Sequence, residues 1–231
     1  MAEDSKILFP HGGYRNLIVY KKSDIIYEAT VLFCRRFLPQ YGDRTVDQMT
    51  QAARSCKQNI AEGSSASGTS KETEIKLTNV ARATLDELQE DYQDYLKSHG
   101  LTEWPLDDAR IAEARELGRS MGDWENWKTY FHSAQPEEYC NYMKVVIMQE
   151  KFLLEKMIQR QERDFLQNGG IRERMHAARN VARSDNCETK IYQRLSSANS
   201  HKELQDIANN IRREIAQCSE TIMQKRGWVN L

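Results

Sequence analysis

The clearest pattern in this 231-residue sequence is the stretch TSKETEIKLTNVARATLDELQEDYQDYLKS at residues 69–98. Its less polar residues recur three and four positions apart, the spacing that lines one face of a helix in a bundle. Thr69, with Glu72 three residues later, matches a capping box at the helix start. The stretch therefore predicts a long amphipathic helix. Its buried face is expected to consist of Thr78, Ala81, Leu85, Leu88, Tyr92 and Tyr95.

Three further segments with helical periodicity flank this stretch. We expect helices over residues 23–38 and 45–62 before it and over residues 136–167 after it. The four helices together predict an all-α fold, an up-down antiparallel four-helix bundle over residues 23–168. The last helix is longer than the second can cover, so one of its ends should pack on another part of the protein.

The remaining parts of the chain surround this bundle. We interpret residues 1–22 as an N-terminal segment, residues 101–135 as a helical insertion and residues 169–231 as a helical C-terminal extension. In the extension, a basic helix over residues 171–183 is expected to end at a polar break at 184–186.

Two apolar surfaces outside the bundle need a packing partner. Ser200, with Glu203, forms a capping box before an amphipathic helix whose apolar positions follow strict four-three spacing. That helix should pack on the long fourth helix or on another subunit. The insertion carries an aromatic cluster, which we expect to pack against the end of the fourth helix or a neighbouring subunit. The cluster consists of Trp104, Trp124, Trp127, Tyr130 and Phe131.

The composition is that of a globular protein, with 39% hydrophobic and 29% charged residues. No apolar run approaches the length of about 20 residues that a membrane span needs, and the N-terminus lacks the layout of a signal peptide. We therefore expect a cytoplasmic protein that does not contact a membrane. The 5 cysteines are widely spaced without a Cys-x-x-Cys pair, so we expect reduced thiols rather than disulfides or a zinc site.

Charge is unevenly distributed although the net charge is only −1. Residues 101–150 hold 5 Lys and Arg against 10 Asp and Glu, whereas residues 151–231 hold 15 against 10. The basic C-terminal third is a candidate nucleic-acid contact, because phosphate neutralisation releases counterions. A solvated helix face, or a contact with the acidic segment of another subunit, explains it equally well. The candidate residues are Arg160, Arg163, Arg172, Arg174, Arg179 and Arg183.

A second candidate site is a polar cluster at the end of the second predicted helix. It precedes a turn rich in glycine and serine, and could form a surface for a partner or a phosphate. Alternatively, Asn59 and Glu62 cap the end of the helix and bond the first turn of the next one. The cluster consists of Arg54, Lys57, Gln58, Asn59, Glu62 and Gly63.

No pattern typical of a catalytic, metal or cofactor site is present. A di-metal bundle needs two Glu-x-x-His motifs, and the sequence contains only the one formed by Glu173 and His176. No nucleophile elbow or papain-like arrangement occurs either. We therefore expect a non-enzymatic protein without cofactors. The alternative is a hydrolase or phosphate-processing enzyme that uses Lys57, Asn59 and Glu62.

Several motifs resemble one bacterial protein family. The string QAARSCKQNIAEG at residues 51–63, followed by SGTSKE at 67–72, resembles the four-helix-bundle proteins named after ribosomal RNA intervening sequences. GGYR at residues 12–15 and FLQNGGIRER at 165–174 look like the subgroup with a C-terminal four helix bundle suffix domain.

This resemblance implies a non-catalytic scaffold or binding protein. A relative within the wider family forms a ring, usually a pentamer, and binds a reverse transcriptase and nucleic acid. By this resemblance we expect a homo-oligomer, possible contacts with nucleic acid or with a nucleic-acid enzyme, and a bundle of four helices. The tail at residues 187–231 matches no motif that we can name.

Overall fold

The computed structural model of the chain describes residue 8 and residues 12–39, 44–120 and 124–225. Every regular element within these parts is a helix. The all-α class expected from the sequence is therefore confirmed. The chain divides into two compact units, residues 1–173 and 174–231, and each unit is described by itself.

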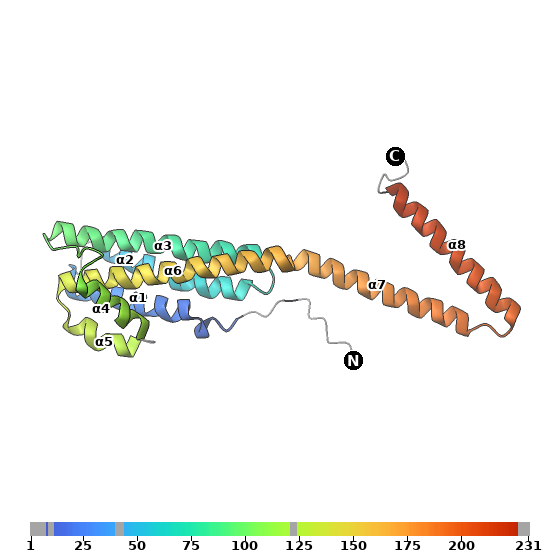
Figure 1. Ribbon diagram of the computed structural model, residues 1–231, viewed down its shortest axis with the longest axis horizontal. Coiled ribbons are helices and arrows are strands. Elements are labelled where there is room, and N and C mark those ends of the chain that lie inside the picture. Colours follow the sequence, from blue (N-terminus) through green and yellow to red (C-terminus); the bar gives the residue numbers. More distant parts are fainter. Residues whose placement is uncertain (1–7, 9–11, 40–43, 121–123, 226–231) are drawn as a thin grey trace. The chain divides into compact units, whose positions relative to one another are not determined.

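Four long helices enclose the core of the first unit. They are α1 (Ile18–Phe37), α2 (Arg44–Ala66), α3 (Lys71–Ser98) and α6 (Pro136–Asn168). Each of them packs on two of the others, since α1 contacts α2, α2 contacts α3, α3 contacts α6 and α6 contacts α1 (Figure 1). The predicted face of α3 is buried at all six positions. The hydrophobic spacing of this stretch therefore identified its core face correctly.

The best-packed part of this core is aromatic. Phe33 on α1 is fully buried, and its ring centroid lies 5.0 Å from that of Tyr92 and 5.3 Å from that of Tyr139. The Tyr92 hydroxyl donates a hydrogen bond to Thr30 Oγ1 at 3.1 Å, and the Tyr139 hydroxyl donates to the Ala29 carbonyl at 2.7 Å. The rings and their hydroxyl groups thus fix α1, α3 and α6 to one another.

Two helix boundaries differ from the sequence prediction. α1 begins at Ile18 rather than at residue 23, because Val19 and Lys22 are buried and belong to its inner face. α2 continues past the predicted end at residue 62, through Gly63 to Ala66. The intrinsic tendency of glycine to end a helix is overridden here because Gly63 is buried against α3.

The start of α3 is capped one residue later than predicted. Ser70 Oγ accepts a hydrogen bond from the Thr73 amide at 3.1 Å, so Ser70 is the N-cap. The Thr69 hydroxyl donates instead to the Ala66 carbonyl at 3.2 Å, in the turn that leaves α2. The predicted Thr69–Glu72 capping box was therefore wrong.

α6 is covered over most of its length within its own unit. At one end the Thr102 amide donates to Glu137 Oε2 at 3.1 Å. At the other end Lys71, at the start of α3, lies 3.4 Å from the Asp164 carboxylate. The 28-residue α3 and the loop after it therefore accompany α6, and one end of α6 packs on that loop, in agreement with the prediction that one of its ends packs on another part of the protein.

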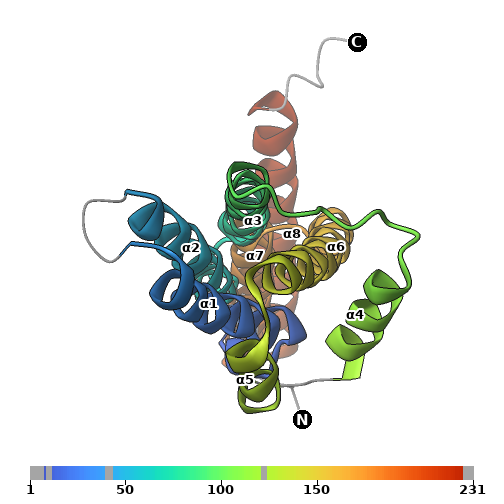
Figure 2. The same ribbon diagram turned by 90° about the vertical axis from the view of Figure 1, so that its left-hand side faces the viewer.

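The insertion forms two short helices, α4 (Ala109–Ser120) on the outside of α6 and α5 (Trp124–Ser133) beside α1 (Figure 2). The side chains of Trp127 and Phe131 are fully buried, and the Phe131 ring centroid lies 4.5 Å from that of Tyr139. The aromatic cluster thus packs against the first turns of α6 within the same chain.

The second unit contains most of α7 (Ile171–Ser196) and α8 (His201–Lys225). The break predicted at residues 184–186 is wrong, since α7 continues through these residues, where neither glycine nor proline interrupts it. Half of the predicted Ser200 capping box is confirmed, since Ser200 Oγ accepts from the Glu203 amide at 3.3 Å. Glu203 Oε2 accepts from the Asn199 amide at 3.0 Å instead of from the Ser200 amide.

Within the parts of the chain that the structure describes, no helix is long and apolar enough to cross a membrane. The same parts contain no group of three or more His, Cys, Asp and Glu side chains that could hold a metal ion. Cys34, Cys56 and Cys140 are buried thiols. The side chains of Cys187 and Cys218 lie outside the described residues.

Candidate interaction surfaces

Lys57 of the polar cluster connects two helices of the core. Its ammonium group lies 2.9 Å from the Asp24 carboxylate on α1 and 4.2 Å from the centre of the Tyr27 ring. Both partners belong to α1, so the side chain of Lys57 spans the α1–α2 contact. An ammonium group used in this way ties the two helices together.

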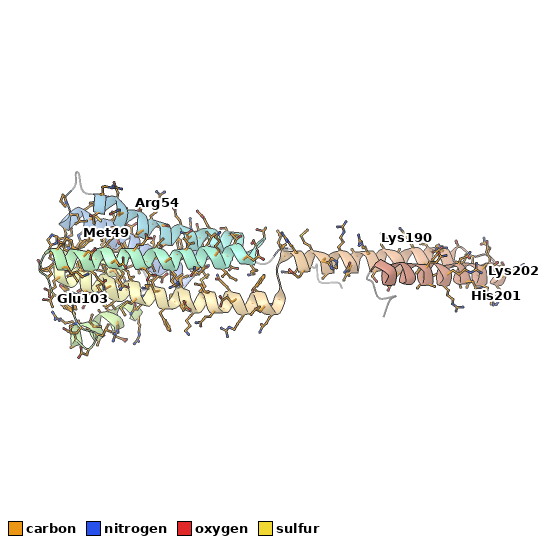
Figure 3. The ribbon with its side chains drawn as sticks, turned by 90° about the horizontal axis from the view of Figure 1, so that it is seen from above. Met49, Arg54, Glu103, Lys190, His201 and Lys202 are labelled. Carbon is orange, nitrogen blue, oxygen red and sulfur yellow. The ribbon has the colours of Figure 1, made fainter. Side chains whose placement is uncertain are left out.

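The other members of the cluster point in different directions. Asn59 donates hydrogen bonds to the carbonyl and hydroxyl oxygens of Ser55, one turn earlier, at 2.9 and 3.1 Å. Arg54, Gln58 and Glu62 are exposed, and Arg54 lies on the outer surface of α2 (Figure 3). At about 100° of rotation per residue, Lys57 lies at least about 140° around the helix from Asn59 and Glu62. The geometry required for joint catalysis by these three side chains is not present.

The capping role considered for Glu62 is also not observed. Ser70 caps the first turn of α3, and within the described residues Glu62 makes no hydrogen bond to that turn. Asn59 bonds within α2 rather than at its C-terminus. The capping interpretation of this cluster is therefore not observed, and the surface for a partner or a phosphate stays a prediction.

Gly63 has a packing role. A Cβ atom at this position would lie 3.4 Å from the Glu74 carbonyl oxygen and 3.4 Å from the Leu77 Cβ atom on α3. The next residue, Ser64, is bonded to the N-terminal segment: its carbonyl accepts from the Gly12 amide at 3.2 Å, and its hydroxyl donates to the Gly12 carbonyl at 3.3 Å. Two of the motifs that carry the family resemblance therefore meet in space.

We predict that Gly63→Ala changes the free energy of unfolding by less than about 1 kcal/mol. The added methyl group fits at ordinary contact distance, and alanine favours the helix by about 1 kcal/mol over glycine. Urea unfolding followed by circular dichroism measures the change, with Glu62→Ala on the exposed face of α2 as control. A decrease in the free energy of unfolding of more than about 2 kcal/mol would show that α2 and α3 cannot move apart enough to accommodate the added methyl group.

A buried polar network between α3 and α6 was missed by the sequence reasoning. The Gln161 amide donates to Glu74 Oε1 at 3.3 Å and to Thr78 Oγ1 at 3.1 Å, and Lys71 lies 3.0 Å from the Glu74 carboxylate. These side chains stand at positions of α3 and α6 where the hydrophobic spacing predicts buried apolar residues. Only the fact that Thr78 and Glu74 are polar at such positions could have indicated the network.

The six candidate arginines do not form a single group. Arg160 and Arg163 lie exposed on α6, in the first unit. On α7, Arg172, Arg179 and Arg183 are exposed and fall within about 40° of one another around the helix. Arg174 is half-buried and lies on the opposite side of α7.

Lys190 extends the face that the three α7 arginines share. It is exposed on α7 (Figure 3). At about 100° per residue it lies at the same angle as Arg172, five helical turns further along the helix. The four cations form no ion pair with any residue that the structure describes. We call this face, Arg172, Arg179, Arg183 and Lys190, the α7 basic stripe.

On α7 itself, no acidic position lies beside the α7 basic stripe; on α8, Glu214 pairs with Arg194, one helical turn after Lys190. The positions three and four residues from its members, where helical neighbours lie, are neutral or basic. The acids Glu173, Asp185 and Glu188 fall at other angles, and Glu173 Oε2 accepts from the Gly170 amide at 3.0 Å at the start of α7. The described neighbours of the stripe include Met175, His176, Asn180, Ala182, Asn186 and Gln193.

Comparison of the chain with models of protein families finds no match, and comparisons with curated proteins and with solved structures find none either. The function proposed below therefore depends on the sequence motifs and on the geometry of the described residues.

Proposed function

We propose that this chain is a non-catalytic, homo-oligomeric scaffold protein, an up-down four-helix bundle that contacts nucleic acid through the extension after α6. The observation that carries this proposal is the α7 basic stripe. Four exposed cations on one helical face, with no acidic neighbour on α7 and no described ion pair of their own, form a surface of positive potential.

The stripe suits contacts with phosphates rather than with bases. From Arg172 to Lys190 it extends about 27 Å, at about 1.5 Å per residue. Each phosphate that a cation neutralises releases condensed counterions, which drives binding regardless of sequence. An aromatic side chain on α7 is exposed at Tyr192, but it points away from the stripe, so stacking on bases is not part of the proposal.

Homo-oligomerisation is supported by the apolar side chains of the second unit. Among the residues of this unit that the structure describes, Ile211 is the one buried apolar side chain. Two helices with so little shared core need further packing to be stable. We therefore propose that other copies of the chain cover these side chains, as a pentamer if the family resemblance holds. The exposed apolar residues are Met175, Val181, Tyr192, Leu204 and Ile215.

The family resemblance also supports a nucleic-acid enzyme, such as a reverse transcriptase, as a protein partner. Such an enzyme and the scaffold would then bind the same nucleic acid in the cytoplasm. Copurification of a reverse transcriptase with the full chain, lost on nuclease treatment, would indicate that nucleic acid bridges the two proteins.

The stripe is tested by removing two of its charges. Arg179→Gln/Arg183→Gln should weaken binding of a 30-nucleotide RNA and a 30-base-pair DNA, because two phosphate contacts are lost. The slope of log K against log salt should become shallower by about 1.8 for duplex DNA. Fluorescence anisotropy over a salt series measures both quantities.

The matched control removes two exposed cations elsewhere, Lys76 on α3 and Lys202 on α8. Lys76→Gln/Lys202→Gln should leave the salt slope within about 0.5 of that of the original protein. Equal losses in the two double variants would show that net charge, and not the stripe, attracts the nucleic acid.

A monomer at micromolar concentration in light scattering would contradict the proposed homo-oligomer.

A further inference from the structure

A large cavity lies beside α6 in the first unit. Its volume is about 1000 Å³, the upper end of the range for small-molecule sites. Its walls come from α4, from the outer face of α6, from α3 and the loop after it, and from the first turns of α1. The inserted segment thus forms one wall of the cavity.

The apolar side chains around this cavity are exposed to solvent. Met148 and Phe152, on one face of α6, are 40% and 61% exposed, and Leu106 and Ile18 are 65% and 64% exposed. All four line the same cavity and form apolar parts of its wall. Such surfaces on soluble proteins mark binding sites.

A buried cation lies at one end of the cavity. Lys22 is only 8% exposed, and its ammonium group donates to the Gly118 carbonyl at 2.7 Å and to Gln149 Oε1 at 2.8 Å. Both acceptors are neutral, and an ammonium group has three N–H donors. Burial lowers the pKa of Lys22, and the Glu150 carboxylate acts in the opposite direction.

Arg115 adds a second positive charge to the lining of the cavity, one helical turn before Gly118 on α4. Its carbonyl accepts from Gln149 Nε2 at 2.8 Å, whereas its guanidinium forms no hydrogen bond or ion pair with the residues that the structure describes. At the other end of the cavity, Lys144 is already paired with Glu103, so that pair is neutral as a whole. The cavity therefore has a cationic end and a predominantly apolar remainder.

We propose that this cavity binds an anionic amphiphile, an apolar chain or ring that carries a single carboxylate or phosphate. The anionic head lies at Lys22 and Arg115, where charge-assisted hydrogen bonds are available. The apolar part covers Met148, Phe152 and Leu106, which removes their side chains from water. This binding activity goes beyond the proposed scaffold function and does not depend on it.

The two ends of the cavity exclude other ligand classes by charge and polarity. A cationic amphiphile would bring a like charge against Lys22 and Arg115. A small free anion could meet the cations but would leave the apolar side chains exposed. Only a ligand with both parts satisfies the whole cavity.

Calorimetry on the full chain tests the proposal with four probes below their micelle concentrations. Dodecanoate and dodecyl phosphate should each bind once per chain. Dodecyltrimethylammonium should bind at least tenfold more weakly than either, which is about 1.4 kcal/mol, and acetate should not bind measurably. The stronger of the two anionic probes identifies the head group that the site prefers.

Two variants locate the site without disturbing the core. Arg115→Gln should weaken dodecanoate binding about tenfold, because it removes one of the two cations proposed to bind the head group. Folding should not change, because the side chain makes no described contact on which folding depends. Met148→Asp should weaken dodecanoate binding at least tenfold, because it places a negative charge in the apolar wall of the cavity at an exposed position. Lys76→Gln, on the outer face of α3, is the control and should bind as the original protein does.

Three results would overturn the proposal. The first is equal binding of the anionic and cationic amphiphiles, and the second is unchanged dodecanoate binding by Met148→Asp. The third is the absence of any binding together with dissociation of an oligomer by Phe152→Asp, which would make this surface a contact between subunits.

Discussion

Replacing Phe33 by alanine is expected to lower the free energy of unfolding of the first unit by about 3–5 kcal/mol. The Phe33 side chain is fully buried and is surrounded by the rings of Phe37, Tyr92, Tyr95 and Tyr139, at centroid distances of 4.9 to 5.3 Å. Its removal deletes buried apolar surface and leaves a cavity lined by rigid rings, which collapses poorly.

Urea unfolding followed by tryptophan fluorescence measures this loss. Trp104 and Trp127 are buried in the first unit and report on its core. Phe152→Ala is the matched control, since the Phe152 ring is largely exposed and its loss should change stability by less than about 1 kcal/mol. Similar losses in the two variants would show that the aromatic cluster is not the main support of the core.

The fold could be predicted because hydrophobic spacing is a local property of the sequence. On α3 the three-and-four pattern from Thr78 to Tyr95 identified the buried face correctly. Helix ends depend on tertiary contacts, which the sequence does not display. Gly63 therefore continues α2, because α3 lies against it, although glycine usually ends helices.

The candidate sites were predicted less well, because adjacency in the sequence is not adjacency on a helix. Lys57, Asn59 and Glu62 lie close together in the chain but diverge around α2. In the same way, Arg174 is near Arg172 in sequence and opposite to it on α7. Counting charges along the chain found the basic region, but only their angles around the helix separate the stripe from its neighbours.

Buried charges were the least predictable feature. Lys22 and Glu150 occupy helical positions that a sequence pattern assigns to solvent-exposed charge, yet both are buried. Long side chains of this kind are rarely buried without a partner, so their location follows only from the packing of α1 against α4 and α6. The burial of the Glu150 carboxyl has a large effect on the stability of the folded protein.

The Glu150 carboxyl lies in the interior without a hydrogen bond. It is fully buried, and neither of its oxygens has a partner among the described residues. Burial raises the pKa of Glu150 well above its ordinary value, and the positive charge of Lys22 only partly opposes this. The facing Cys56 thiol on α2 stays protonated, because burial and the Glu150 carboxylate both raise its pKa.

A raised pKa gives stability a definite dependence on pH. The folded protein holds the Glu150 proton more tightly than the unfolded chain does. The resulting stabilisation is complete below the ordinary glutamate pKa, near 4.5, and is lost as the pH rises through the folded value. Above that pH the folded state must contain an ionised carboxylate without hydrogen bonds, which costs free energy.

Glu150→Gln should therefore stabilise the protein by about 1–3 kcal/mol at pH 8 and by less than about 0.5 kcal/mol at pH 4. The amide keeps the size of the side chain and removes its charge. Urea unfolding at intervals between pH 4 and pH 8 measures the difference, and Glu155→Gln, exposed on the same helix, controls for loss of one acid. A variant less stable than the original protein at pH 8 would mean that the ionised carboxylate is stabilised in the folded state. Lys22 would then have to approach Glu150 more closely than its bonds to Gly118 and Gln149 place it.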